Sequence, residues 1–157
     1  MNNVFYKLAG NPEDYSLGKE LILEYAGLLG IDLCFQNFDK EIINLSDMYS
    51  HPEGGLIIAY VDDTAIGVAG IRKFENDVCE LKRMYVKYDF RGKGIGRELL
   101  DSAIKLAGTL NYKTIKLDTL ESMKSAIKLY IACGFVETLS YRHNPDESVR
   151  FFELKLN

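Results

Sequence analysis

The stretch from Cys79 to Leu110 constrains the fold most, because a strand pattern, a glycine-rich turn and a helix pattern follow one another directly. Residues 80–86 (E-L-K-R-M-Y-V) alternate and end in aromatic and β-branched residues, which predicts a strand. From residue 95 onward, apolar side chains recur at helical spacing, which predicts an amphipathic helix. Between them lies R-G-K-G-I-G, so the chain turns from strand to helix through glycine.

Such a turn is suited to binding an anion. The first amides of a helix have no intrahelical acceptor and lie at the positive end of the helix dipole, so a phosphate or pyrophosphate can accept their hydrogen bonds. Two commoner phosphate motifs do not fit. A P-loop needs Ser or Thr after its lysine, but Gly94 follows Lys93, and the dinucleotide fingerprint needs G-x-G-x-x-G rather than G-x-G-x-G. The alternative is a turn that only joins strand to helix.

The composition bounds the class of protein. A chain of 157 residues predicts one domain, 1–157, and 47% hydrophobic with 27% charged residues is ordinary for a globular protein. The formal net charge of -4 argues against nucleic acid as a partner. A local basic cluster on an acidic protein suits a small anionic ligand; it consists of Lys82, Arg83, Lys87, Arg91, Lys93 and Arg97.

Other residue types point to the cytoplasm. The three cysteines, Cys34, Cys79 and Cys133, form no C-x-x-C and indicate reduced thiols. His51 and His143 have no partners at metal-ligand spacing, so no metal site is expected. No apolar run approaches the ~18 residues of a membrane span, and the N-terminus does not read as a signal peptide. We therefore expect a cytoplasmic protein with no membrane partner.

The predicted elements follow the order β-α-α-β-β-β-α-β-α-β-β. Strands are expected at 4–9, 56–61, 65–74, 79–86, 114–118, 135–141 and 149–156, and helices after Pro12, from Asp39 to about Leu45, after Gly94 and after Ser122. The fifth strand pairs in parallel with the fourth, since a helix connects them. Gly67 and Gly70 predict a bulge or a close backbone approach in the third strand. Residues 31–38 mix aromatic and polar side chains without a clear period.

Two motifs give the chain a resemblance to a known family. R-G-K-G-I-G, after a strand that ends Met84-Tyr85-Val86, resembles the acetyl-CoA signature R/Q-x-x-G-x-G/A of the GNAT acetyltransferase superfamily. A-I-K-L-Y-I-A-C-G-F at 126–135 resembles that family's second signature, A-x-x-L-Y-x-x-x-G-F. Two signatures in the right order are more specific than either alone, and the resemblance covers almost the whole chain.

The resemblance implies an α/β (α+β) fold, the single-domain GNAT acyl-CoA N-acyltransferase fold, in which a mixed, largely antiparallel sheet carries helices on both faces. Strands 79–86 and 114–119 would splay apart, and the pantetheine of acetyl-CoA would lie in the gap. The implied cofactor contacts are Met84, Tyr85, Val86, Arg91, Gly92, Lys93, Gly94, Ile95, Gly96 and Arg97. One position departs from the family. An asparagine that contacts pantetheine is replaced by Met123, and Ser122 or Ser125 can substitute for it.

The implied reaction is transfer of the acetyl group to a primary amine of a small molecule or peptide, by direct attack in a ternary complex. Tyr130 matches the family tyrosine that serves as general acid to the coenzyme A sulfur. A phenol with a pKa of ~10 stays protonated and can donate to a thiolate whose conjugate acid has a pKa of ~8.5. Without the resemblance, the alternative interpretation of Tyr130 is a core aromatic residue on an amphipathic helix.

Two further residues are candidates. Glu80 is the candidate base, directly or through water, if a partly desolvated cleft raises the pKa of its carboxyl. The alternatives are ordered water as the base and a strand-edge charge at Glu80 that pairs with a neighbouring lysine or arginine. Arg72, beside Glu80 in the expected sheet, can bind a carboxylate of an amino-acid-like or peptide acceptor. It can equally form a salt bridge to Glu80.

Two classes of function stay open. One is an acetyl-CoA-dependent N-acetyltransferase, and the other is a non-catalytic acyl-CoA-binding sensor or interaction module. The presence of Tyr130 together with the complete glycine turn favours the enzyme, because a sensor does not need an acid. By analogy with the family, a homodimer is one assembly that the chain can form.

Overall fold

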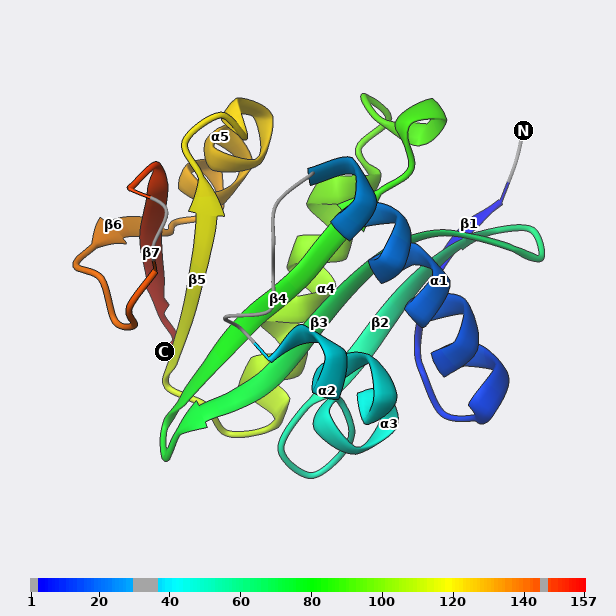
Figure 1. The fold of residues 1–157 in the computed structure, drawn as a ribbon, viewed down its shortest axis with the longest axis horizontal. Helices are drawn as coiled ribbons and strands as arrows, with labels where there is room; N and C mark the ends of the chain where they lie inside the picture. Colours follow the sequence, from blue (N-terminus) through cyan, green and yellow to red (C-terminus); the bar gives the residue numbers. More distant parts are fainter. Residues whose placement is uncertain (1–2, 30–36, 145–146) are drawn as a thin grey trace.

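The computed structural model describes residues 3–29, 37–144 and 147–157, which build one sheet with helices on both faces (Figure 1). The elements follow in the order β1 (Val4–Leu8), α1 (Pro12–Leu29), α2 (Phe38–Ile43), α3 (Leu45–Met48), β2 (Gly55–Val61), β3 (Thr64–Glu75), β4 (Val78–Val86), the 3-10 turn η2 (Tyr88–Phe90), α4 (Ile95–Thr109), β5 (Thr114–Leu120), α5 (Lys124–Ala132), β6 (Val136–Thr138) and β7 (Val149–Lys155).

The seven strands lie in the order β1-β2-β3-β4-β5-β7-β6. The β4–β5 pair is parallel, and the other neighbouring pairs are antiparallel. The helix α4 connects β4 to β5, as a parallel pair requires. The predicted mixed, largely antiparallel sheet is therefore confirmed.

The two faces of the sheet carry two cores, because alternate residues of a strand point to opposite faces. In β2, Leu56, Ile58 and Tyr60 pack on the side of α1 and α3. Their neighbours Ile57 and Ala59 pack on the side of α4 and α5. Figure 1 shows α1, α2 and α3 in front of the sheet and α4 behind it.

Gly70 allows the front layer to approach the sheet closely. A Cβ atom at Gly70 would lie 2.5 Å from the ring of Tyr49. Tyr49 directly follows α3 in the chain and is fully buried. This close approach is what the glycine in the third strand predicted. It places Tyr49, and the helices around it, directly over the middle of β3.

The strands β4 and β5 separate after a short parallel contact. Val78, Cys79 and Glu80 pair with 114–116, and no register continues beyond Glu80. Figure 1 shows the two strands diverging toward the end where α5 begins. The splay expected from the family resemblance is therefore present, and it leaves the β5-facing side of 81–86 without a strand partner among the described residues.

A β-bulge lies in this unpaired part of β4. The register steps from Gly70↔Lys82 to Val68↔Tyr85, so β4 carries one extra residue there. Arg83 adopts φ 60, a left-handed conformation that costs a non-glycine residue about 1–2 kcal/mol. The bulge turns Arg83 toward α2, on the same face as Lys82.

Three predicted boundaries were wrong. The helix α2 begins at Phe38, after Asn37 in the left-handed region, and not behind a capping Asp39. The helix α5 begins at Lys124 and is preceded by Met123, not capped by Ser122. The strand expected at 135–141 has only the three residues of β6, because the chain leaves the sheet edge and turns inward. Residues 31–36 lie outside the described residues.

Within the described ranges, no helix is both long and apolar enough to cross a membrane. Cys79 and Cys133 are free thiols, and Cys34 lies outside the described residues.

Candidate active site

The glycine turn between η2 and α4 forms an open cradle of amide groups. Gly92 and Gly94 have φ of 76 and 83, and a Cβ atom at either would meet nothing within 4 Å. The first intrahelical bond of α4 runs from the Glu98 amide to the Gly94 carbonyl, at 3.1 Å. The amides of 95–97 precede it and have no intrahelical acceptor. Open space, positive φ and aligned donors fit a pyrophosphate group.

Basic side chains surround the cradle. Arg91 donates from Nε to the Val86 carbonyl at 2.9 Å, and its guanidinium lies 5.7 Å from the centre of the Tyr85 ring. Lys93 lies 5.5 Å from the Phe90 ring centre, and Arg97 pairs with a residue of its own helix. The basic cluster predicted as one patch is in fact divided, because Lys82 and Arg83 are buried elsewhere on β4.

Lys82 and Arg83 belong to a second group, the buried charge cluster, on the face that α1, α2 and α3 cover. It is made of the following side chains, each in an ion pair with another member: Glu41, Arg72, Glu80, Lys82, Arg83, Asp118 and Arg142. Alternation in β4 explains the burial. Cys79 and Leu81 enter the core on the α4 side, so Glu80 and Lys82 point to the other face.

Glu41 on α2 binds Arg83 through both oxygens. Arg83 Nε lies 2.8 Å from Oε2, and Nη2 lies 2.9 Å from Oε1. The Tyr49 hydroxyl donates to Oε2 at 3.0 Å, and Arg72 Nη1 lies 3.5 Å from Oε1. Burial alone raises the pKa of Glu41, but the hydrogen bonds and charge of Arg83 lower it below its ordinary value. This pair fastens α2 to the bulge of β4.

Glu80 lies between two guanidinium groups. Arg142 Nη2 lies 2.5 Å and Arg72 Nη2 3.4 Å from Oε1, and the Tyr141 hydroxyl donates to Oε2 at 2.9 Å. Burial raises the pKa of Glu80, but Lys82, Arg142 and Arg72 lower it more. The expected raised pKa is therefore wrong, because the carboxylate is fully surrounded by cations and a donor. The salt bridge from Arg72 to Glu80, the alternative for Arg72, is present. Among the described residues, the ion-pair partners of Glu80 are Arg72 and Arg142, and not Lys82, Arg83 or Lys116, the partners expected for a strand-edge charge.

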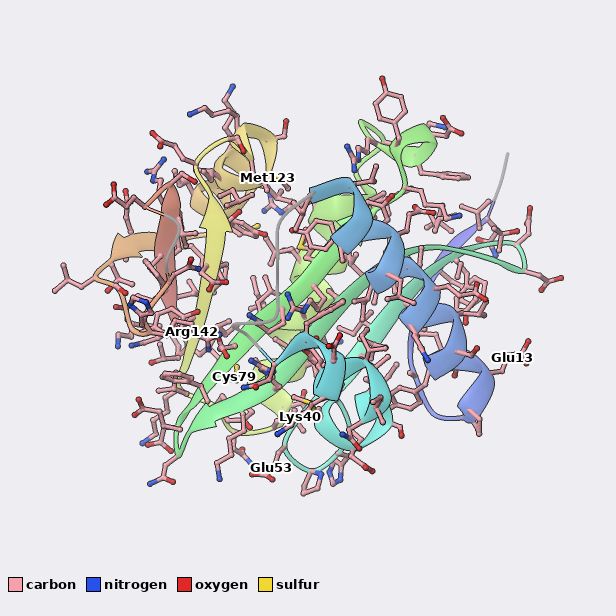
Figure 2. All side chains as sticks on the ribbon, in the orientation of Figure 1. Glu13, Lys40, Glu53, Cys79, Met123 and Arg142 are labelled. Atoms are coloured by element: carbon pink, nitrogen blue, oxygen red, sulfur yellow. The ribbon has the colours of Figure 1, made fainter. Side chains whose placement is uncertain are left out.

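Tyr141 and Arg142 reach this site from the segment that follows β6. The Tyr141 ring packs edge-on against Phe74 and Phe151, with centroids 5.1 and 5.3 Å apart. Arg142 lies over the Tyr141 ring at 5.2 Å. Figure 2 shows Arg142 on the β5 side of the gap. The inward turn of the chain after Thr138 therefore supplies both residues.

Asp118 lies on β5 beyond the last residue that pairs with β4. Its Oδ1 is 3.8 Å from Lys82 Nζ, across the gap. Its Oδ2 is buried and has no hydrogen-bond partner among the residues that the structure describes. Burial lowers the pKa of Lys82 to about 8, although the Asp118 carboxylate opposes this shift.

Tyr130 lies on α5, and it is a buried member of the core on the α4 side of the sheet. The ring is 7% exposed and lies 5.8 Å from that of Phe135 and 6.4 Å from that of Phe152. Burial raises the pKa of Tyr130, and the nearby Tyr25 and Asp118 raise it further. The hydroxyl is therefore protonated throughout the neutral range.

Met123 stands at the position where the resemblance implied an asparagine that contacts pantetheine. Figure 2 shows it at the wide end of the gap, next to the start of α5. The Met123 amide donates to Leu120 and its carbonyl accepts from Ile127, at 2.9 and 3.0 Å. The backbone turn that starts α5 therefore forms without the asparagine side chain.

Residues 24–135 match the acetyltransferase (GNAT) family. The chain belongs to this family. It is 34% identical to an uncharacterised N-acetyltransferase of Schizosaccharomyces pombe, over 99% of this chain and 97% of the other. A GNAT acetyltransferase of Staphylococcus aureus has the same fold, with a TM-score of 0.82, 23% identity and coverage of 99% and 100%. The acetyltransferase yncA of Salmonella typhimurium, solved with its cofactor acetyl-CoA, matches at a TM-score of 0.71 and 18% identity, over 98% and 94%.

The predicted GNAT fold is thus confirmed, while the roles of individual site residues stay predictions. The structure joins Arg72 and Glu80 in an ion pair, and it places Met84–Val86 at the end of β4, just before the glycine turn, and Tyr130 on α5. The sequence reasoning missed Glu41, Asp118, Tyr141 and Arg142. One signal was available in the sequence. Glu80 and Lys82 alternate with Cys79 and Leu81 in a strand expected at the centre of the sheet, which indicates that polar side chains are buried on one of its faces. No local pattern marked Tyr141, whose position depends on the turn after β6.

Proposed function

We propose that this GNAT protein is an acetyl-CoA-dependent N-acetyltransferase of the cytoplasm that acetylates a primary amine of a small molecule or peptide by direct attack in a ternary complex. The observation that carries the proposal is the combination of the glycine cradle and the separation of β4 from β5, with Tyr130 on α5, the helix that follows β5. The acetyl-CoA seen with the Salmonella relative supports the choice of donor.

The donor site consists of backbone groups along β4 and α4. The amides of 92–97 would bind the pyrophosphate, and the free edge of Met84–Val86 would pair with pantetheine as an added strand does. Arg91 would release the Val86 carbonyl, its present acceptor, when pantetheine pairs there. Acetyl-CoA supplies an activated acyl group, because its thioester carbonyl is electrophilic and the thiolate is a good leaving group.

Tyr130 would complete the reaction at the sulfur. The amine forms the new bond to the carbonyl carbon, the carbon–sulfur bond breaks, and the phenol gives its proton to the departing sulfur. The proton that the amine nitrogen loses on forming the amide replaces the one given by Tyr130. A phenol is suited to this role only while it is protonated, and burial keeps the pKa of Tyr130 above its ordinary value.

The buried charge cluster would receive the acceptor. Among the residues that the structure describes, its four cations, Arg72, Lys82, Arg83 and Arg142, outnumber its three carboxylates, Glu41, Glu80 and Asp118, by one positive charge. A carboxylate-bearing amine, such as an amino acid or the end of a peptide, would balance that charge. We assign its carboxylate to the guanidinium groups that Glu80 holds in place, those of Arg72 and Arg142.

The alternative function is a non-catalytic acyl-CoA sensor. To distinguish the two, the protein is mixed with acetyl-CoA and a panel of amines, and free thiol and acetylated product are measured by a thiol reagent and by mass spectrometry. An enzyme releases thiol and product in equal amounts, above the rate without amine. A protein that binds acetyl-CoA but releases no thiol with any amine would be a sensor, and the proposal would fail.

A further inference from the structure

We propose that Asp118 binds the ammonium group of the acceptor through Oδ2 and takes its proton before acetyl transfer. This inference rests on the proposed function and names a catalytic residue that the sequence reasoning did not consider. It also assigns Glu80 a positioning role, to hold Arg72, Arg142 and Tyr141, and not the role of the base.

The first reason is the unused oxygen of Asp118. Its side chain is 10% exposed, and Oδ2 has no partner within the described part of the chain. A buried carboxylate oxygen without a donor is unfavourable, and such atoms in native proteins call for an explanation. A bound ammonium group carries three N–H donors and would satisfy Oδ2.

The second reason is its location. Asp118 is two residues beyond Lys116, the last β5 residue that pairs with β4, so it lies where the strands have separated. Its charge acts on Tyr130 of α5, on Tyr25 of α1 and on Tyr141. The carboxylate therefore lies where β4 and β5 have separated, and its charge acts on the phenol that we assign as the acid.

The third reason is that Glu80 is already engaged. Its two oxygens accept from Arg72, Arg142 and Tyr141 and face no open side of the site. An ammonium group approaching Glu80 would also approach two guanidinium groups, which repel it. Of the two carboxylates Glu80 and Asp118, Asp118 is the one with an oxygen that has no partner among the described residues.

The proton balance of the step is simple. The ammonium group gives one proton to Asp118 Oδ2, and the resulting neutral amine attacks the thioester carbonyl carbon. The nitrogen loses a second proton as the amide forms, and the sulfur receives one from Tyr130. One proton is released in total, from Asp118 to solvent, when the product leaves.

The test compares Asp118→Asn with Glu80→Gln, two isosteric replacements that each remove one carboxylate charge. Each variant is assayed with the common L-amino acid that the wild type acetylates fastest, or with its best amine if no amino acid reacts. The second nucleophile is an O-substituted hydroxylamine that carries the same substituent as this amine. Its nitrogen is neutral at pH 7, so no base is needed to remove a proton before it attacks. We expect Asp118→Asn to lower kcat/KM for the amine by ~10²–10⁴-fold, the usual contribution of a general base.

The hydroxylamine separates catalysis from structure. It should be acetylated by Asp118→Asn at close to the wild-type rate, whereas Glu80→Gln should lose activity equally with both nucleophiles. Acetyl-CoA affinity, measured by calorimetry, should stay at the wild-type value in Asp118→Asn. If Asp118→Asn does not fold, Asp118→Ala is assayed with added formate, which should restore turnover where an equal concentration of chloride does not.

Three results overturn the inference in different ways. Wild-type turnover of the amine by Asp118→Asn shows that Asp118 is not needed. A defect of Glu80→Gln that disappears with the hydroxylamine identifies Glu80 as the base. A wild-type protein that binds acetyl-CoA and acetylates nothing refutes the proposed function itself, and the role of Asp118 falls with it.

Discussion

Replacement of Tyr130 by phenylalanine tests the chemistry with little disturbance of the fold. The ring is 7% exposed and lies against Phe135 and Phe152, and these contacts survive in Tyr130→Phe. Among the hydrogen bonds of the described residues, none uses the Tyr130 hydroxyl, so its removal leaves none of their groups without a partner. We therefore expect the free energy of unfolding to change by less than about 1 kcal/mol.

The effect on turnover should be far larger. Loss of a general acid typically lowers the rate by ~10²–10⁴-fold, which corresponds to about 2.7–5.5 kcal/mol in the activation free energy. Acetyl-CoA affinity should be nearly unchanged, because we place the donor site at the glycine cradle and the β4 edge. The raised pKa of Tyr130 also means that its ionisation should not produce an alkaline loss of activity near neutral pH.

The assay must separate chemistry from product release. Single-turnover rates, with enzyme in excess of acetyl-CoA, report the chemical step even where steady-state turnover is limited by another step. A matched control is Tyr25→Phe, which removes a nearby phenol that we do not place at the sulfur. Single-turnover rates of Tyr130→Phe equal to those of the wild type would refute the role of the phenol.

The remaining predictions concern the donor site, the acceptor site and stability. Gly96→Val should fold, since its Cβ would lie 3.6 Å from Leu129, but should bind acetyl-CoA more weakly by calorimetry; unchanged affinity would contradict the pyrophosphate site. Arg72→Ala should raise KM for carboxylate-bearing acceptors more than for their amides, and equal changes would remove Arg72 from carboxylate binding. Arg83→Met should lower the unfolding free energy by about 3–5 kcal/mol in denaturant titrations, because it leaves Glu41 charged and buried. The lowered pKa of Glu41 stabilises the wild type above the ordinary carboxyl pKa of 4.5, and this stability should be lost as the pH falls through the folded-state value. Glu41→Gln should show a shallower acid loss, and an identical pH dependence would contradict this reasoning.

The sequence by itself determined the glycine turn and the broad order of the elements, although three helices and not the expected two lie between β1 and β2. The glycine turn lies between strand and helix in one continuous stretch, so its amides and φ values follow from residues within a few positions of one another. The place of Tyr130 on α5 follows likewise from helical spacing. Such features depend on local backbone preferences, which a sequence pattern expresses directly.

The tertiary structure decided the buried charge cluster, where we place the acceptor. Glu41 and Arg83 are 42 residues apart, and Glu80 and Tyr141 are 61 residues apart. Their contacts depend on the strand order, on the bulge that turns Arg83 toward α2 and on the short β6 that releases Tyr141 from the sheet. The pKa of Glu80 depended on this arrangement too. Burial alone would raise it, but cations from three separate segments surround the carboxyl and lower it. The charge of a buried group is set by its neighbours in space, and the sequence shows only its neighbours along the chain.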